Sequence, residues 1–193
     1  MTQTLVDGTT TTKKFRYAKD YVFTSAPSST DTAAVALKEL NDTNRHGSLV
    51  EQTTRVTPSG GSAVLTDASL IVYRKANGKT FPYYLKGVNT GVDVTESTLS
   101  GGNSLTVDAD YFTVRTFKEY DGSGRPVWEF DKNKNKLVHS YASLYGHEVA
   151  TFANIKSAQA VTEGFETPSS AGLNLIAGSP SYPAGWTGAK SIQ

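Results

Sequence analysis

The chain has 193 residues, 37% of them hydrophobic, and its 19 basic and 18 acidic side chains leave a formal net charge of +1. A charge so close to zero creates no field that would attract nucleic acid or an anionic membrane surface. The sequence contains no cysteine, which excludes disulfides, a cysteine-ligated zinc site and a thiol nucleophile. No apolar run approaches the roughly 18 residues of a membrane-spanning helix, and abundant Thr, Ser, Gly, Asn and Tyr favour an elongated β architecture.

The first part of the chain predicts short strands and one helix. Residues 1–12 are polar and threonine-rich, consistent with an edge strand, and residues 15–17 predict a short aromatic-flanked strand. Residues 31–41 carry alanine and leucine at helical spacing behind Asp31, a residue that can cap a helix, so they predict one short α-helix. Alternation over residues 49–56 then predicts a half-exposed strand.

A β-hairpin is predicted next, at residues 70–85. Asn77-Gly78 is the residue pair that two-residue hairpin turns favour, so the strands on either side of it should pair directly. Pro82 lacks an N–H, which predicts either a donor side that faces outward or a bulge. Residues 89–108 are rich in Thr, Ser and Gly and predict a loop with one short strand near residues 92–95.

Residues 111–141 are the most organised stretch of the sequence and predict strand, turn, strand, turn, strand. Aromatic, β-favouring runs flank the glycine-rich turn that begins at Asp121, where glycines permit positive φ and the aspartate can accept turn N–H bonds. A polar turn at residues 132–135 leads into a strand that ends at Tyr141. The tyrosines offer wide cross-strand contact area, and an arginine beside them can stack on their rings.

This stretch resembles the YD repeat of RHS-type proteins, in which a Tyr-Asp pair opens a glycine-containing turn, Gly-Arg follows, an Asp closes the next strand and a Tyr ends the one after. The matching residues are Tyr120, Asp121, Gly124, Arg125, Asp131 and Tyr141. They cover about one repeat, and the order of the neighbouring elements extends the resemblance to RHS-like proteins of Bacteroidota over roughly residues 10–156.

The resemblance implies an all-β fold of mainly antiparallel hairpins that form an open, curved sheet. It also implies a secreted or bacterial cell-surface protein whose signal would lie upstream of this sequence. In that family the repeats wind a β-sheet shell around a C-terminal effector, usually a toxin, and the activity lies in the effector. On this interpretation the chain is a non-enzymatic scaffold whose open sheet edges pair with other segments of the same polypeptide or with like chains.

The last part of the chain changes character. Residues 164–166 read Gly-Phe-Glu, and Thr187-Gly188 is followed by a serine at position 191, a combination that resembles the opening of a carbohydrate-binding-module-like jelly roll. A jelly roll needs about eight strands, more than the remaining residues can supply. The sequence therefore predicts a β-sheet segment at 1–158 and, at 159–193, a linker with the truncated start of a second module.

No set of residues predicts catalysis, a cofactor or a metal centre. His46, His139 and His147 are scattered, and a hairpin that brought the last two together would still lack a third metal ligand. Glu129 and Asp131, two residues apart, share a strand face and are interpreted as solvent-facing charges that keep a sheet edge soluble. Asp131 with the asparagines that follow it lacks the spacing of a calcium loop.

Two further functional hypotheses stay open beside the scaffold. One is a surface adhesin or carbohydrate-binding module, in which exposed aromatic rings stack on the faces of a glycan. Its candidate residues are Tyr83, Tyr84, Tyr120, Trp128 and Tyr141. The other is a hydrolase, the least favoured, because the sequence offers no nucleophile elbow, metal motif or phosphate-binding loop.

Overall fold

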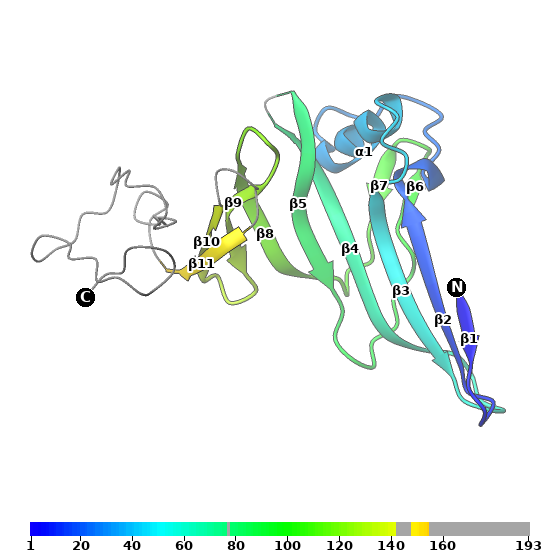
Figure 1. Cartoon of the computed structure of the whole chain (residues 1–193). Helices are drawn as coiled ribbons and strands as arrows, with labels where there is room; N and C mark the ends of the chain where they lie inside the picture. Colours follow the sequence, from blue (N-terminus) through cyan, green and yellow to red (C-terminus); the bar gives the residue numbers. More distant parts are fainter. Residues whose placement is uncertain (77, 142–147, 155–193) are drawn as a thin grey trace, which may run out of the picture. The chain divides into compact units, whose positions relative to one another are not determined.

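A computed structural model describes residues 1–76, 78–141 and 148–154 of the chain. These residues form mostly antiparallel β-structure with one short α-helix (Figure 1), which confirms the all-β class and the predicted helix. The helix α1 spans Thr32–Asp42, and a 3-10 turn η1 spans Ala18–Asp20. The strands are β1 Thr2–Thr4, β2 Thr10–Tyr17, β3 Leu49–Thr57, β4 Val64–Ala76, β5 Lys79–Gly87, β6 Thr98–Ser100, β7 Ser104–Thr106, β8 Phe112–Tyr120, β9 Pro126–Asp131, β10 Lys136–Tyr141 and β11 Glu148–Ala153.

The larger sheet has nine strands in the hydrogen-bonded order β1-β2-β3-β4-β5-β8-β9-β10-β11, and β6 pairs with β7 in a sheet of two strands. Strands that follow one another in sequence are therefore neighbours, except where residues 88–111, here called the β5–β8 connection, carry the β6–β7 hairpin. The chain separates into two compact units, unit 1 at Met1–Phe117 and unit 2 at Lys118–Gln193. The boundary that the sequence predicts at residue 158 lies outside the described residues.

The β4–β5 hairpin follows the sequence prediction. Ala76 pairs with Lys79 across the predicted two-residue turn, and Gly78 has a φ of 72°. The register shifts where Val72 pairs with Tyr84 and Tyr73 pairs with Pro82, so of the two arrangements predicted for the proline the strand adopts the bulge. The shift leaves Tyr83, next to the proline, without a register partner, and bulges are among the few places where a strand accommodates proline.

The prediction of a short strand at residues 92–95 is wrong. Those residues belong to no strand, and the strands of this region are β6 and β7. The turn between β6 and β7 contains Gly101 and Gly102, which both have positive φ, so glycine placement decides where the hairpin forms. Gly102 also accepts a backbone hydrogen bond from Thr24, and a Cβ at this glycine would overlap the Thr24 hydroxyl.

The core of unit 1 lies between α1 and the sheet. Ala36, Leu37 and Leu40 of the helix are buried together with Leu70 and Val72 of β4, and Figure 1 shows the helix beside one end of the long strands. Burying apolar surface in this way stabilises by roughly 25 cal/mol per Å2.

Asp31 fixes where the helix begins and also holds the β6–β7 hairpin. Its Oδ1 accepts a hydrogen bond from the N–H of Ala34 at 2.9 Å, as an N-cap does. Its Oδ2 accepts from the hydroxyl of Ser104 at 2.8 Å and the N–H of Leu105 at 3.1 Å. One carboxylate therefore joins the helix N-terminus to β7.

Candidate functional site

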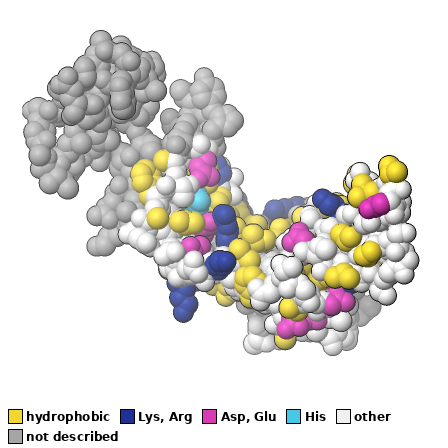
Figure 2. All heavy atoms as spheres, turned by 90° about the horizontal axis from the view of Figure 1, so that it is seen from below, with side chains coloured by type: hydrophobic (Ala, Val, Ile, Leu, Met, Phe, Trp, Pro, Cys, Tyr) yellow, Lys and Arg dark blue, Asp and Glu magenta, His cyan; other side chains and the backbone are white. Residues whose placement is uncertain are grey.

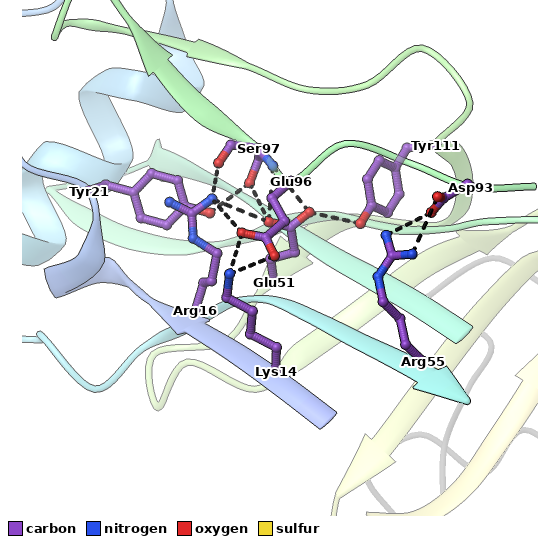
Figure 3. A network of polar contacts seen from close by, with 9 residues as sticks. All are labelled: Lys14, Arg16, Tyr21, Glu51, Arg55, Asp93, Glu96, Ser97 and Tyr111. Carbon is purple, nitrogen blue, oxygen red and sulfur yellow. Dashed lines mark hydrogen bonds and ion pairs between the residues drawn. The ribbon is translucent and has the colours of Figure 1, made fainter. Parts of the chain in front are cut away.

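Glu51 lies at the centre of the polar network of unit 1 (Figure 3). In the sheet it stands opposite Arg16 of β2 and Leu70 of β4, so the three side chains share one face. The glutamate is only 1% exposed. A buried carboxylate is costly unless it is paired and hydrogen-bonded, so its surroundings must supply donors.

The donors come from the β5–β8 connection. Ser97 donates to Glu51 Oε2 through its backbone N–H at 3.0 Å and its hydroxyl at 2.8 Å. The hydroxyl of Tyr111 donates to Oε1 at 2.8 Å. Arg16 places Nη1 3.7 Å from Glu51 Oε2 and also donates to the carbonyl of Ser97. Both carboxylate oxygens thus accept hydrogen bonds, and a guanidinium lies beside them.

Two tyrosines complete the network as neutral hydroxyls. Because the Ser97 hydroxyl donates to Glu51, the Tyr21 hydroxyl 2.6 Å away is the donor to Ser97. Burial raises the pKa of Tyr21 to about 12. Burial, together with the hydrogen bond to Glu51, also raises the pKa of Tyr111. Both phenols therefore keep their protons at neutral pH and remain donors.

The centre of this network is closed. The pocket that Glu51 lines with Lys14, Arg16, Thr53 and Glu96 has a volume of about 0 Å3. A reacting group needs room for a substrate beside it, and Glu51 has none. Its role is structural: by accepting hydrogen bonds from Ser97 and Tyr111, Glu51 holds the β5–β8 connection on the face of β3 and is called the Glu51 clamp below.

A shallow hollow lies beside the clamp, with a volume of about 480 Å3. Asp93 in its wall pairs with Arg55, Oδ1 to Nη2 at 2.7 Å, and this hydrogen-bonded pair lowers the pKa of Asp93. Asp108 accepts hydrogen bonds from the N–H of Asp110 and from the N–H and hydroxyl of Thr95, which lower its pKa to about 2. Asp93 therefore joins the connection to β3, whereas Asp108 holds residues of the connection to one another.

The YD-like residues of unit 2 form a closed turn. Asp121 Oδ1 accepts from the N–H of Ser123 and of Arg125, both at 2.9 Å, and Oδ2 accepts from Arg125 Nε at 2.7 Å. Gly124 has a φ of 84° and donates its N–H to the Asp121 carbonyl. Arg125 lies over the ring of Tyr141 at 4.6 Å, and the Tyr141 hydroxyl donates to the Pro126 carbonyl at 2.9 Å.

The turn that follows ten residues later repeats this pattern. Asp131 Oδ1 accepts from the N–H of Asn133 and of Asn135 at 2.8 Å, and Oδ2 accepts from Asn135 Nδ2 at 2.9 Å. Lys134, with a φ of 64°, occupies the position that Gly124 has in the first turn. The N–H groups of the two asparagines donate to both oxygens of the aspartate, so this turn is closed by the same kind of hydrogen bonds as the first.

The predicted aromatic residues divide between the two units. In unit 1 the rings of Tyr83 and Tyr84 are 4.2 Å apart, and Arg74 lies 4.1 Å above Tyr83. In unit 2 Trp128 meets Phe130 edge to face. Its indole N–H donates to Glu119 at 2.7 Å, and Lys136 lies 4.5 Å from its ring centre. Tyr120 is half-buried at the end of β8.

One prediction about charged residues needs correction. Glu129, interpreted from sequence as solvent-facing, is 0% exposed. It faces His139 across neighbouring strands, with Oε1 3.7 Å from Nε2, and the side chain of this histidine is only 7% exposed. His46 contacts the Asn41 carbonyl at 3.0 Å, and His147 lies outside the described residues. No cluster of three or more metal-ligating side chains occurs among residues 1–76, 78–141 and 148–154.

The Glu51 network does not follow from the sequence patterns described above. Glu51 shares its side of β3 with Thr53 and Arg55, so the alternation along the predicted half-exposed strand does not mark the glutamate as buried. Its partners Ser97 and Tyr111 are separated from it by 46 and 60 residues, so nothing local marks them.

The chain matches no protein-family model, no curated protein and no solved structure. Within the described part of the chain, no helix combines the length and apolarity that crossing a membrane requires. On the face drawn in Figure 2, basic and acidic side chains are interspersed, and neither sign forms a continuous field there.

Proposed function

We propose that this chain is a non-enzymatic structural segment of a secreted or bacterial cell-surface scaffold, built on hairpins of the YD-repeat type. The observation that supports it most is the repetition of one aspartate-centred turn at Asp121 and Asp131, with the same hydrogen bonds to the residues two and four positions on. A turn that recurs in this way can add successive hairpins to a growing sheet. In a longer protein such a sheet could enclose a C-terminal effector.

The polar side chains of both units bond mainly to residues of their own unit, which supports the same function. Asp121, Arg125 and Tyr141 hydrogen-bond or stack with residues of their own unit. The best-formed polar centre of unit 1 is closed around Glu51. Groups that satisfy one another inside the fold stabilise it and leave little capacity for a substrate.

Glycan binding remains the second hypothesis, and the geometry favours it less. A cation already lies over the ring of Tyr83, of Trp128 and of Tyr141, so one face of each is covered. A glycan array tests it directly: strong binding that is lost on Trp128→Ala would favour the adhesin over the scaffold.

Self-association through sheet edges tests the scaffold. β1, the first strand in the order of the larger sheet, pairs with β2 through Met1 and Leu5, so by alternation the N–H of Thr4 points away from β2. Sedimentation velocity over rising protein concentration is expected to show reversible association, because unpaired edge groups template another strand.

Two edge variants provide the control. Thr4→Pro removes the outward N–H and should weaken association, whereas Thr4→Val keeps the N–H and should leave it unchanged. A chain that stays strictly monomeric at high concentration would contradict the scaffold function.

A further inference from the structure

One face of the sheet in unit 1 is covered by the β5–β8 connection. Lys14 of β2 pairs with Glu96 of the connection at 2.7 Å. Arg55 of β3 pairs with Asp93 of the connection at 2.7 Å. Figure 3 shows these side chains on the same side of the strands as Glu51. Because successive side chains of a strand alternate between the two faces, the residues between them point away from the connection.

The opposite face of β2, β3 and β4, here called the open face, carries exposed apolar side chains. Phe15 of β2 is 36% exposed and Val64 of β4 is 53% exposed, whereas Leu65, on the covered face, is buried. Val56 of β3 stands beside Val64 in register. Apolar groups left in water gain free energy when another surface covers them, so this face is suited to contact. By register, the open face comprises Thr11, Lys13, Phe15, Gln52, Thr54, Val56, Val64, Asp67 and Ser69.

The open face also carries one charge of each sign at the same level of the sheet. Lys13 of β2 and Asp67 of β4 both stand opposite Thr54 of β3, one on each side of it. Both side chains are exposed, and within the described part of the chain neither forms an ion pair. Two strand spacings, about 10 Å, separate them in one sheet. A surface with opposite charges on either side of a central strand is complementary to its own copy.

We propose that the open face binds the open face of a second copy of this chain, with a two-fold axis that runs along β3. Such an axis lays β2 of one copy over β4 of the other without a change of level along the strands. Lys13 of each copy then meets Asp67 of the other. Sheets that pack face to face lie about 10 Å apart, a distance that an extended lysine and an aspartate side chain span together. The open face is separate from the β1 edge, so this pair does not rest on the proposed scaffold function.

The pair should be weak, because its contact is small. Strands about 4.8 Å apart that rise about 3.3 Å per residue give the face of β1–β5 an area of at most roughly 600 Å2. Each partner of a standard protein interface buries about 800 Å2. We therefore expect a dissociation constant of about 10 μM or higher, with the two charge contacts setting which surfaces pair.

Charge reversal in the whole chain tests the pair. Sedimentation velocity would be measured in chains that also carry Thr4→Pro, which weakens pairing at the β1 edge and leaves the open face unchanged. Lys13→Glu and Asp67→Lys each set like charges against one another at both contacts, so each should weaken association on the order of tenfold. Mixed in equal amounts, the two variants should associate as strongly as the parent chain, because each supplies the charge that the other lacks.

Lys19→Glu is the matched control, because it changes the net charge by the same amount from η1, outside the open face, and should leave association unchanged. If a charge variant fails to fold, Val64→Lys decides, because it buries an unpaired charge in the same contact and should also weaken association. A parent chain with Thr4→Pro that stays monomeric would overturn the pair and leave the β1 edge as the site of any wild-type association. Unchanged association in the variants, or no recovery in the mixture, would also overturn it.

Discussion

The two units use carboxylates in opposite ways. In unit 1, Glu51 gathers donors that lie 46 and 60 residues further along the chain. In unit 2, Asp121 and Asp131 each gather donors no more than four residues away. The first arrangement holds a long connection against a sheet, and the second fixes the reversal of a single hairpin.

This difference predicts how many residues lose their native structure when one carboxylate is removed. Ordering a long connection carries a closure entropy that few contacts offset, so removal of one centre such as Glu51 should release a whole segment. A turn that closes within five residues gains little chain entropy when it opens. Loss of its hydrogen bonds should therefore affect only the turn and the strands next to it. Substitutions in the two units therefore separate the two mechanisms.

Replacement of Glu51 by alanine is expected to have the largest effect. It leaves Ser97 and Tyr111 with buried donors that lack an acceptor and removes the nearer of the two carboxylates beside Arg16. Breaking a buried pair on one side costs about 3–5 kcal/mol. Native-state hydrogen exchange should show the loss across the β5–β8 connection and β3, with unit 2 amides unchanged.

Glu96→Ala is the matched control for Glu51→Ala. Glu96 lies at the rim, where its side chain is 35% exposed and pairs with Lys14 at 2.7 Å. An exposed pair contributes about 0–1 kcal/mol, so this change should be small. Equal effects of the two substitutions would show that Glu51 does not act as a buried centre.

Replacement of Asp121 by alanine should have a smaller, local effect. The turn loses the hydrogen bonds from Ser123 and Arg125, a cost of about 1–2 kcal/mol. Thermal unfolding and exchange of the β9 amides would measure it. Loss of protection in unit 1 as well would contradict the local character of the turn.

The pKa of Asp121 predicts the direction in which its stabilising effect changes with pH. Desolvation raises the pKa of Asp121, but the hydrogen bonds from Arg125 and Ser123 outweigh it, and the net shift is downward. A carboxyl whose folded pKa is depressed stabilises the fold above its unfolded pKa of about 3.9, and that stability is lost as the pH falls through the folded pKa. Asp121→Asn should remove this part of the acid dependence.

The sequence predicted best what is local. The helix at α1, the Asn-Gly hairpin, the bulge beside Pro82 and the positive φ at Gly124 follow from residues a few positions apart, because turn and cap chemistry acts over that range. The strand register that places Arg16 opposite Glu51 depends on the whole sheet. The burial of Glu129 against His139 depends on it too, so neither pairing could be predicted from its neighbours in sequence.

The smallest effects concern the fourth position of the two turns of unit 2, where Gly124 of the first turn corresponds to Lys134 of the second. Gly124 and Lys134 both have positive φ, 84° and 64°, a conformation that costs a non-glycine residue about 1–2 kcal/mol. Lys134→Gly relieves this cost but gives the unfolded chain more conformational entropy, so it should stabilise unit 2 by about 0.5 kcal/mol. Gly124→Ala places a side chain at positive φ and should destabilise unit 2 by about 1 kcal/mol. Lys134→Ala removes the side chain but keeps a non-glycine residue at positive φ, so the free energy of unfolding of unit 2 should change by about 0 kcal/mol. Chemical denaturation followed at unit 2 amides distinguishes the three, and a loss of stability in Lys134→Gly would mean that the lysine side chain contributes more than its backbone conformation costs.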